Sequence, residues 1–271
     1  MRARLARWGL VAVIAAATAP WLAGCASGPP AATPLAVEAA ILAPTGSLRV
    51  GVYPGSPTSL VRDAKTGQSA GVAYELGQAM AVRLGVPVRV VEYQRVAQVV
   101  AAVKAGELDM TFTNATAARE RDVDFTVPLV RLELGFLVPA RSTLASIADI
   151  DKPGMRVGVT EGSSSSSSLP RLLKSASILT APSMDAVQAM LRDGRLDAFA
   201  TNKGILFELS DALPGSRVLA GRWGLEGLAI AVPKGRQLAQ PWLQQFVTDV
   251  QSGGQLKAIV ARAGLRGSAA E

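Results

Sequence analysis

The chain has 271 residues, 49% of them hydrophobic, and carries 28 Lys and Arg against 21 Asp and Glu. It contains no histidine and one cysteine, which excludes an internal disulfide, a Cys/His metal site and a histidine-based hydrolytic triad. The basic residues form no cluster of the kind that nucleic-acid binding requires, so we expect no nucleic-acid partner. We also expect no cofactor and no bound metal.

Residues 1–24 have the pattern of an export signal. Three arginines within the first seven residues precede an apolar run from Leu10 to Leu22, which is shorter than the about 20 apolar residues that match a bilayer. The run ends in Leu-Ala-Gly-Cys25, which resembles the lipobox of bacterial lipoproteins, in which the cysteine is lipidated and becomes the mature N-terminus. An ordinary signal peptide, or a membrane anchor, with a chance cysteine is the alternative. Cleavage before Cys25 leaves 25 Lys and Arg against 21 Asp and Glu, a net charge of +4.

Residues 25–45 are rich in Pro and Ala and are predicted to form a lipidated tether. A short helix over residues 35–42 is compatible with the sequence, but nothing requires it.

From residue 48 onward, strand and helix patterns alternate. The sequence predicts an apolar strand at 48–52, a helix at 72–84, a strand at 86–91, a helix at 96–105 and a strand at 108–113. The first helix has a stripe of apolar residues at four-residue spacing, namely Val72, Leu76, Met80 and Leu84, and ends at Gly85. This alternation predicts a parallel sheet with helices on both faces.

Two segments of this unit are repeated later in the chain. The segment Arg49–Ser56 (RVGVYPGS) returns as Arg156–Ser163 (RVGVTEGS). Gly106–Asp109 (GELD) followed by Asn114 returns as Gly194–Asp197 (GRLD) followed by Asn202, with the same spacing from Gly to Asn. The repeats predict two lobes of related architecture, although convergent use of Gly-x-Leu-Asp turns is an alternative. Ligands bind at the carboxyl ends of strands in open parallel sheets, so the small polar residues at these ends predict one shared cleft.

Several segments, in order, resemble the family 3 extracytoplasmic solute-binding proteins, which serve ABC importers mainly of polar amino acids. The segments are Gly71–Leu76 (GVAYEL), Thr116–Arg119 (TAAR) followed by Val123–Pro128 (VDFTVP), Val157–Ser164 (VGVTEGSS), Gly227–Lys234 (GLAIAVPK) and the closing helix Leu256–Leu265. The resemblance implies an α/β, two-lobed periplasmic-binding-protein-like fold of type II. Each lobe would have a mainly parallel sheet flanked by helices, and a two-segment hinge would join them. Lobe 1 would comprise residues 46–138 plus 228–271, and lobe 2 residues 139–227.

The same resemblance implies a set of ligand-binding residues. Arg119 would hold a carboxylate through two parallel donors, with Arg121 as a rival by proximity and a solvated charge as the alternative role. The polar contacts would come from Asn114 and Thr116 in lobe 1, from Ser163, Ser164 and Asn202 in lobe 2, and from Tyr53 and Ser56 at the end of the first strand. The serine run that begins at Ser163 is compatible with a flexible loop, with the start of a helix, or with both.

One departure from the family pattern concerns the ligand's charge. Relatives that select α-amino acids usually carry a carboxylate where this chain has Asn202, and an amide cannot form an ion pair with an ammonium group. Ordinary α-amino acids are therefore not expected as ligands unless Glu161 or another acid takes over that role. In addition, the segment from Asp109 to Arg119 is two residues shorter than usual, which displaces the contacts predicted within it.

These observations predict a monomeric, non-enzymatic protein of the periplasm or cell envelope, held to a membrane by lipid on Cys25. It would capture a small carboxylate-bearing solute (an amino acid, a derivative or an organic acid) for an ABC permease in the inner membrane. One alternative is an enzyme on the same scaffold that resembles cyclohexadienyl dehydratases, with Glu161 and Glu75 as candidate acids. Another is a ligand-sensing or scaffolding lipoprotein.

Overall fold

The computed structural model describes residues 34–63 and 65–269. The predicted export signal, the lipobox cysteine Cys25 and the first part of the predicted tether lie outside these residues. The fold described below is that of one compact unit, Thr33–Glu271. None of the helices within the described ranges is long and apolar enough to cross a membrane.

The described residues of the first half of this unit form ten elements. In chain order they are α1 (Pro34–Leu42), β1 (Leu48–Val52), β2 (Val61–Arg62), β3 (Ser69–Ala70), α2 (Val72–Leu84), β4 (Val88–Glu92), α3 (Val96–Lys104), β5 (Thr111–Asn114), α4 (Ala117–Glu120) and β6 (Val123–Phe125). The strands and helices predicted between residues 48 and 114 are therefore confirmed. Helix α1, at the end of the predicted tether, packs against the first half. Its last residue, Leu42, and the following residue, Ala43, are buried in the hydrophobic core of that half.

The rest of the chain forms the second half and then returns to the first. Its elements are β7 (Val130–Val138), η1 (Ile147–Asp149), β8 (Arg156–Thr160), α5 (Ser164–Leu172), β9 (Ser177–Ala181), α6 (Met184–Arg192), β10 (Ala198–Asn202), α7 (Lys203–Ala212), β11 (Arg217–Val218), β12 (Gly224–Pro233), η2 (Gln237–Ala239), α8 (Gln240–Ser252) and α9 (Gln255–Arg262).

Helix α2 shows how the sequence sets the local structure. The predicted apolar stripe lies in the core, with Leu76 and Met80 fully buried. Gly85 ends the helix in the left-handed conformation, and its N–H donates to carbonyls of the last turn. At Gly77 a Cβ atom would lie 2.5 Å from the Val50 side chain, so a glycine allows α2 to pack closely on β1.

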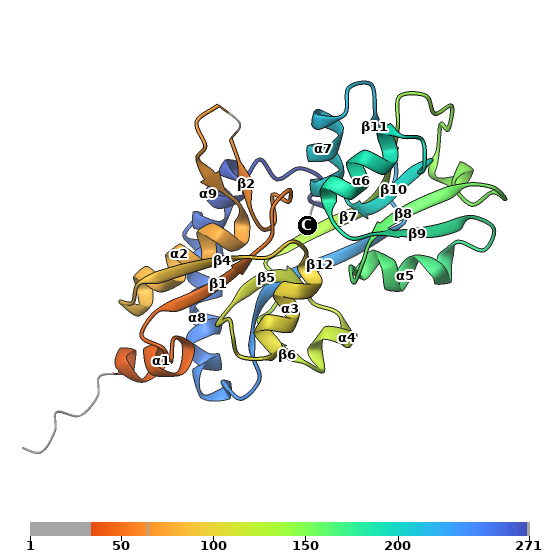
Figure 1. The fold of residues 1–271 in the computed structure, drawn as a ribbon. Helices are drawn as coiled ribbons and strands as arrows, with labels where there is room; N and C mark the ends of the chain where they lie inside the picture. The colour runs from red at the N-terminus through yellow and green to blue at the C-terminus, as the bar shows by residue number, and fades with distance from the viewer. Residues whose placement is uncertain (1–33, 64, 270–271) are drawn as a thin grey trace, which may run out of the picture. The chain divides into compact units, whose positions relative to one another are not determined.

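Parallel strands form the centre of each half. β1 pairs in parallel with β4 and forms a bridge to Met110, just before β5, while β8 lies parallel between β9 and β10. Antiparallel pairing enters with the long strands β7 and β12, which run between the halves (Figure 1). Residues 130–134 of β7 pair with β12, and residues 134–137 pair with β10. The α/β fold with two lobes joined by two chain segments is thus confirmed, and the sheets are mixed. The lobe boundaries given above stay a prediction.

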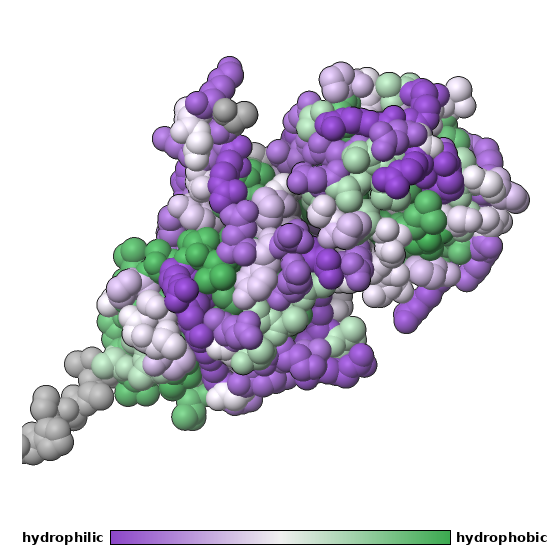
Figure 2. All heavy atoms as spheres, viewed as in Figure 1, coloured by the Kyte–Doolittle hydropathy of each residue, from purple (hydrophilic) through white to green (hydrophobic). Residues whose placement is uncertain are grey.

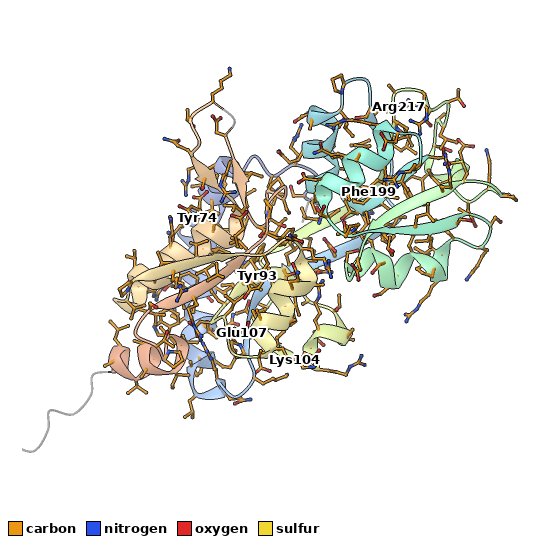
Figure 3. All side chains as sticks on the ribbon, viewed as in Figure 1. Tyr74, Tyr93, Lys104, Glu107, Phe199 and Arg217 are labelled. Atoms are coloured by element: carbon orange, nitrogen blue, oxygen red, sulfur yellow. The ribbon has the colours of Figure 1, made fainter. Side chains whose placement is uncertain are left out.

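Each half has its own hydrophobic core. In the first half, α1, α2, α8 and α9 cover one face of the strands and α3 covers another, around Val99 and Val103. In the second half, α6 and α7 pack around Phe199, which Figure 3 shows within that half, and α5 packs against the opposite side. Figure 2 shows apolar atoms gathered over the end of the first half that carries α1, α2 and β4, where Leu35, Val37, Val82, Val88 and Val90 are exposed.

Candidate functional site

The repeated Gly-x-Leu-Asp segments fix corresponding strands in the two halves. In the first half, the Asp109 carboxylate accepts hydrogen bonds from the Arg49 backbone N–H (2.9 Å), Nε (2.8 Å) and Nη2 (2.8 Å). In the second half, Asp197 accepts the same three bonds from Arg156, at 3.0, 2.9 and 2.8 Å. The two copies therefore share a detailed hydrogen-bond pattern, which supports the prediction of related lobes.

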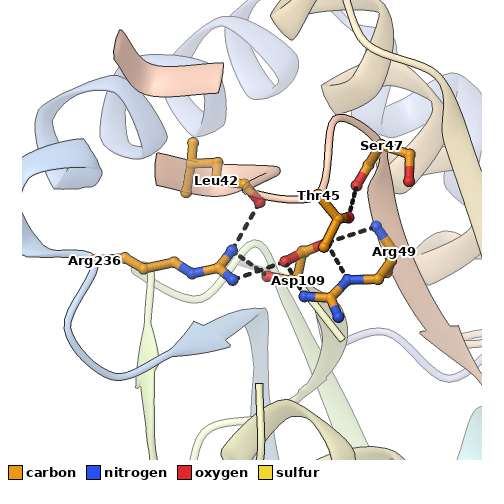
Figure 4. Close-up of polar contacts among 6 residues, drawn as sticks. All are labelled: Leu42, Thr45, Ser47, Arg49, Asp109 and Arg236. Carbon is orange, nitrogen blue, oxygen red and sulfur yellow. Dashed lines mark hydrogen bonds and ion pairs between the residues drawn. The ribbon is translucent and has the colours of Figure 1, made fainter. Parts of the chain in front are cut away.

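The copy in the first half has one further partner. Arg236, just before η2, donates to Asp109 Oδ1 at 2.7 Å and to the carbonyl oxygen of Leu42 at 2.7 Å (Figure 4). This arginine joins α1, the segment before β5 and the segment after β12. Burial by itself raises the pKa of Asp109, but the guanidinium groups of Arg49 and Arg236 hold it below its ordinary value.

A cavity of about 40 Å³ lies at the carboxyl ends of these strands and is lined from both halves. Its lining residues are Tyr53, Thr58, Gln94, Arg95, Val96, Thr113, Asn114, Arg119, Thr160, Ser163, Ser164, Met184, Thr201, Asn202, Ile205, Glu226 and Leu228. Six of the eight residues predicted to contact a ligand are among them. A wider hollow of about 350 Å³ shares Gln94 and Met184 with this cavity.

The Arg119 side chain reaches this cavity from α4. Its Nη1 group donates to Thr113 Oγ1 at 2.8 Å and to the backbone and side-chain oxygens of Asn114. Burial lowers the pKa of Arg119, while Tyr53 and Glu226 oppose that shift; a guanidinium nevertheless stays charged in proteins. Among the described residues no carboxylate lies within ion-pair distance of Arg119. The cavity therefore contains a cation with no ion-pair partner.

Two residues predicted near Arg119 do not line the cavity. The Thr116 hydroxyl accepts a hydrogen bond from the Arg119 backbone N–H at 3.3 Å, so it caps α4 instead. The rival Arg121 is exposed and does not line the cavity. Thr116 thus sets the direction of the turn that carries Arg119.

Glu226, on β12, is the cavity residue that sequence reasoning missed. Its Oε1 accepts from Asn202 Nδ2 at 3.0 Å and its Oε2 accepts from the Ser164 hydroxyl at 3.2 Å. Burial raises the pKa of Glu226, and the hydrogen bonds from Asn202 and Ser164 and the charge of Arg119 counteract that shift. No cation in the described part of the chain lies within ion-pair distance of its carboxylate. The sequence feature that could have identified Glu226 is its position as an acid in an otherwise apolar strand, just before the Gly227–Lys234 segment.

The second half contributes two helix caps to the site. Asn202 Oδ1 accepts from the Ile205 backbone N–H at 3.1 Å and so caps α7, which leaves its Nδ2 group to hold Glu226. Ser163 Oγ accepts from the Ser166 backbone N–H at 3.2 Å and caps α5. The serine run therefore starts a helix, and the first hydroxyl of that helix, on Ser164, faces Glu226.

The Tyr53 ring closes another side of the cavity. Its backbone N–H donates to Ser59 Oγ at 2.8 Å, and its hydroxyl lies 3.5 Å from Ser56 Oγ. Burial raises the pKa of the Tyr53 hydroxyl. Ser56 itself is fully buried beside the Tyr53 hydroxyl, shares a 2.8 Å hydrogen bond with Thr58, and does not line the cavity.

The two halves touch each other beside the cavity. Arg95 of the first half forms a 3.3 Å ion pair with Glu161 of the second and donates to the carbonyl oxygen of Pro182. A Cβ atom on Gly162 would lie 2.5 Å from Ala97 Cβ. Glu161, one of the acids considered for catalysis or amine binding, is half exposed in this contact and does not line the cavity. The other, Glu75, also lies outside the cavity and pairs with Arg262.

Residues 48–264 match the family described as bacterial extracellular solute-binding proteins, family 3. The ABC transporter glutamine-binding protein GlnH of Bacillus subtilis (strain 168) is 25% identical over 152 residues, which make up 55% of this chain and 55% of that protein. The chain thus matches about half the length of this relative.

Solved structures with the same fold include several amino-acid receptors. The solute receptor for L-cysteine of Neisseria gonorrhoeae has a TM-score of 0.73 and 25% identity, over 83% of this chain and 92% of that one. The ancestral amino acid-binding protein AncCDT-1, a precursor of cyclohexadienyl dehydratase, has a TM-score of 0.70 and 25% identity, over 82% and 96%. AbpA of Streptococcus pneumoniae Canada MDR_19A, bound to L-arginine, has a TM-score of 0.73 at 21% identity, over 82% and 96%, and shows the fold alone.

Proposed function

Because the chain belongs to the bacterial extracellular solute-binding proteins of family 3, we propose that it captures a small carboxylate-bearing solute for an ABC importer. The solute is an amino acid, an amino-acid derivative or an organic acid. Similarity to the glutamine-binding protein of an ABC transporter and to the L-cysteine receptor supports a role in amino-acid import.

The observation that carries this proposal is the position of Arg119. Its guanidinium lines a cavity between the two halves, and among the described residues it has no acidic partner. Its recorded hydrogen bonds all use Nη1, so Nε and Nη2 remain for a carboxylate, which a guanidinium binds through two parallel bonds. The free Nε and Nη2 donors of Arg119 therefore favour a ligand with an anionic group, such as a carboxylate.

Capture by closure explains why both halves line the cavity. A ligand stabilises a closed form only through contacts that the open form does not make. Arg119 belongs to the first half, whereas Ser163, Ser164 and Asn202 belong to the second, so a ligand that touches both sets favours closure around the two connecting strands. We place lobe 1 at residues 46–138 plus 228–271 and lobe 2 at 139–227, as the sequence predicts.

The family is extracellular, which implies a location in the periplasm or cell envelope. We propose that lipid on Cys25 anchors the protein to a membrane, that it acts as a monomer, and that it delivers its solute to a permease in the inner membrane. Mass spectrometry of the protein purified from a bacterial membrane would test the anchor. A diacylglycerol mass on Cys25 is expected, and an unmodified chain cleaved elsewhere would contradict it.

Ligand binding is best tested with the protein lacking residues 1–24. Thermal unfolding and calorimetry across a panel of amino acids and organic acids should identify compounds that raise the melting temperature, because they bind the folded state alone. In Arg119→Met, affinity for any such compound should fall at least roughly 30-fold, the lower range for truncating one side of a buried charge pair. The matched control is Arg121→Met, at an exposed arginine two residues away, which should keep full affinity. Equal affinity in wild type and Arg119→Met would overturn the proposal.

A second candidate function is supported by Glu226. A buried carboxyl whose pKa burial raises is suited to donate a proton to a bound substrate, and one similar structure is a precursor of cyclohexadienyl dehydratase. Incubation with prephenate and with arogenate distinguishes the two functions, since product formation that Glu226→Gln abolishes would establish the enzyme. If no compound stabilises the protein and neither substrate turns over, a sensing or scaffolding lipoprotein becomes the better account.

A further inference from the structure

The cavity contains two opposite charges that do not neutralise each other directly. Arg119 donates to Thr113 and Asn114, while Glu226 accepts from Asn202 and Ser164. Within the described residues no ion pair joins Arg119 to Glu226 or joins either of them to another side chain. Both residues are partly buried, and an unpaired charge is costly to withdraw from water, so this pair of charges is best explained by a ligand that pairs with both.

We propose that Glu226, held by Asn202 and Ser164, binds a protonated amine of the ligand, so that the solute is a compact zwitterionic amino acid. This inference rests on the proposed function, which assigns the carboxylate of the same solute to Arg119. It goes beyond that function because it excludes organic acids without an amine. It also assigns the amine to a residue on β12 and not to the end of β10.

The hydrogen bonds of Glu226 leave room for a cation. A carboxylate offers about four lone-pair sites, and the two recorded bonds occupy one on each oxygen. An ammonium group has three donors and no acceptor, so it complements the remaining sites. A ligand hydroxyl would satisfy at most one of them and would leave the buried negative charge uncompensated.

Asn202 acts here as a positioning residue for Glu226. Its Oδ1 is committed to the N–H of Ile205 at the start of α7, which fixes the direction of its Nδ2 group toward Glu226. The amide at position 202 therefore does not remove the acid from the site. It orients an acid that a neighbouring strand supplies.

The size of the cavity restricts the ligand's side chain. The cavity of about 40 Å³ is bordered by the apolar side chains of Met184 and Ile205. Expansion toward the rim would separate the Arg95–Glu161 ion pair and the contact between Gly162 and Ala97. We therefore expect the protein to bind a short, uncharged side chain in preference to a long cationic one, which would require that separation.

The experiment compares α-amino acids with the 2-hydroxy acids that have the same carbon skeleton. The pairs are L-alanine and L-lactate, L-leucine and L-2-hydroxyisocaproate, and L-glutamate and L-2-hydroxyglutarate, with L-arginine as the long cation. Calorimetry on the wild-type protein should show at least roughly 30-fold tighter binding of L-alanine than of L-lactate, the lower range for a buried charge left unpaired. L-Arginine and L-leucine should bind more weakly than L-alanine.

Glu226→Gln tests the assignment of the amine. The amide keeps an acceptor for Asn202 but removes the charge, so the preference for L-alanine over L-lactate should fall to less than about threefold. Glu75→Gln, at a carboxylate that pairs with Arg262 away from the cavity, is the matched control and should leave that preference unchanged. The double variant Asn202→Asp with Glu226→Gln should restore it, because it returns an acid to the same corner of the cavity.

The outcomes separate this inference from the function on which it rests. If Arg119→Met abolishes binding while Glu226→Gln keeps the preference for amines, the carboxylate site stands and the amine site is refuted. Equal binding of L-lactate and L-alanine by wild type, or preferred binding of L-arginine, refutes the compact zwitterion. Absence of binding by every member of the panel refutes both proposals. Turnover of prephenate or arogenate that depends on Glu226 would assign this carboxyl to proton transfer instead.

Discussion

Substituting the repeated aspartate in each half should produce very different losses of stability. Asp109 and Asp197 accept the same three hydrogen bonds from an arginine within the first two residues of a strand, namely Arg49 and Arg156. Their surroundings differ, however. The Asp109 side chain is 0% exposed and also pairs with Arg236, whereas the Asp197 side chain is 27% exposed. The two aspartates therefore show how the same hydrogen-bonding motif contributes to stability when it is fully buried and when it is partly exposed.

The expected magnitudes follow from burial. Asp109→Asn removes the charge that compensates two guanidinium groups, and breaking a buried ion pair typically costs about 3–5 kcal/mol. Asp197→Asn alters a pair that water screens, and we expect a loss of about 1–2 kcal/mol. For a domain of this size each kcal/mol shifts the melting temperature by roughly 2–4 °C, so Asp109→Asn should lower it by roughly 6–20 °C and Asp197→Asn by roughly 2–8 °C.

Urea unfolding followed by circular dichroism at neutral pH measures both losses. The Asp109 contribution should be complete at this pH, because its pKa lies below the ordinary value and a depressed carboxyl pKa stabilises the fold above the unfolded value. Ligand affinity should change little in either variant, since neither residue lines the cavity. Equal losses in the two variants, or a larger loss at Asp197, would refute the account based on burial and on Arg236.

Two further predictions concern the cavity. Burial raises the pKa of Glu226 above its ordinary value, so affinity for L-alanine, measured by calorimetry, should fall as the pH drops through that raised pKa. In Glu226→Gln this dependence of affinity on pH should disappear, and an unchanged dependence in the variant would contradict the prediction. The stability of the ligand-free protein should depend on pH in the opposite direction. An acid with a raised pKa stabilises the fold fully below its pKa in the unfolded chain, about 4.3, and this contribution is lost as the pH rises through the raised pKa. Gly162→Ala should weaken ligand binding when affinity is measured by calorimetry, since its Cβ would lie 2.5 Å from Ala97 of the other half. Gly85→Ala is the control, because Gly85 has the same φ of 68° and no neighbour within 4 Å; it should lose about 1 kcal/mol of stability and keep its affinity. Equal affinities in the two variants would contradict the role of the Gly162–Ala97 contact in closure.

Local patterns allowed the fold to be predicted from the sequence. The apolar stripe of α2 and the glycine that ends it are properties of neighbouring residues, and the repeated Gly-x-Leu-Asp segments identify corresponding strands without any knowledge of their contacts. The spacing from Thr116 selected Arg119 over Arg121, and the structure places Arg119 in the cavity. Each of these features is a spacing or a short segment of neighbouring residues, which can be read directly from the sequence.

The residues that were misplaced depend on contacts between distant segments. Ser56 aligns with Ser163 in the repeat, but in the turn after β1 the Ser56 hydroxyl bonds Thr58 and lies beside the Tyr53 hydroxyl, whereas Ser163 caps the start of a helix. Thr116 has the predicted spacing, yet its hydroxyl is used by the short helix that it caps. In both cases a local hydrogen bond, which no spacing rule displays, takes the side chain away from the cavity.

Position 202 shows why a site is a property of neighbours in space. The sequence indicates that an amide stands where an acid is usual, which points away from amino acids. In the structure the Nδ2 group of Asn202 lies 3.0 Å from the Oε1 atom of Glu226, 24 residues further along the chain. The charge that the cavity needs is thus supplied by β12, a strand that runs between the two halves. Loss of the preference for amines in Glu226→Gln, and its return when Asn202→Asp is added, would therefore show that the acid recognises the ligand from either of these two neighbouring positions.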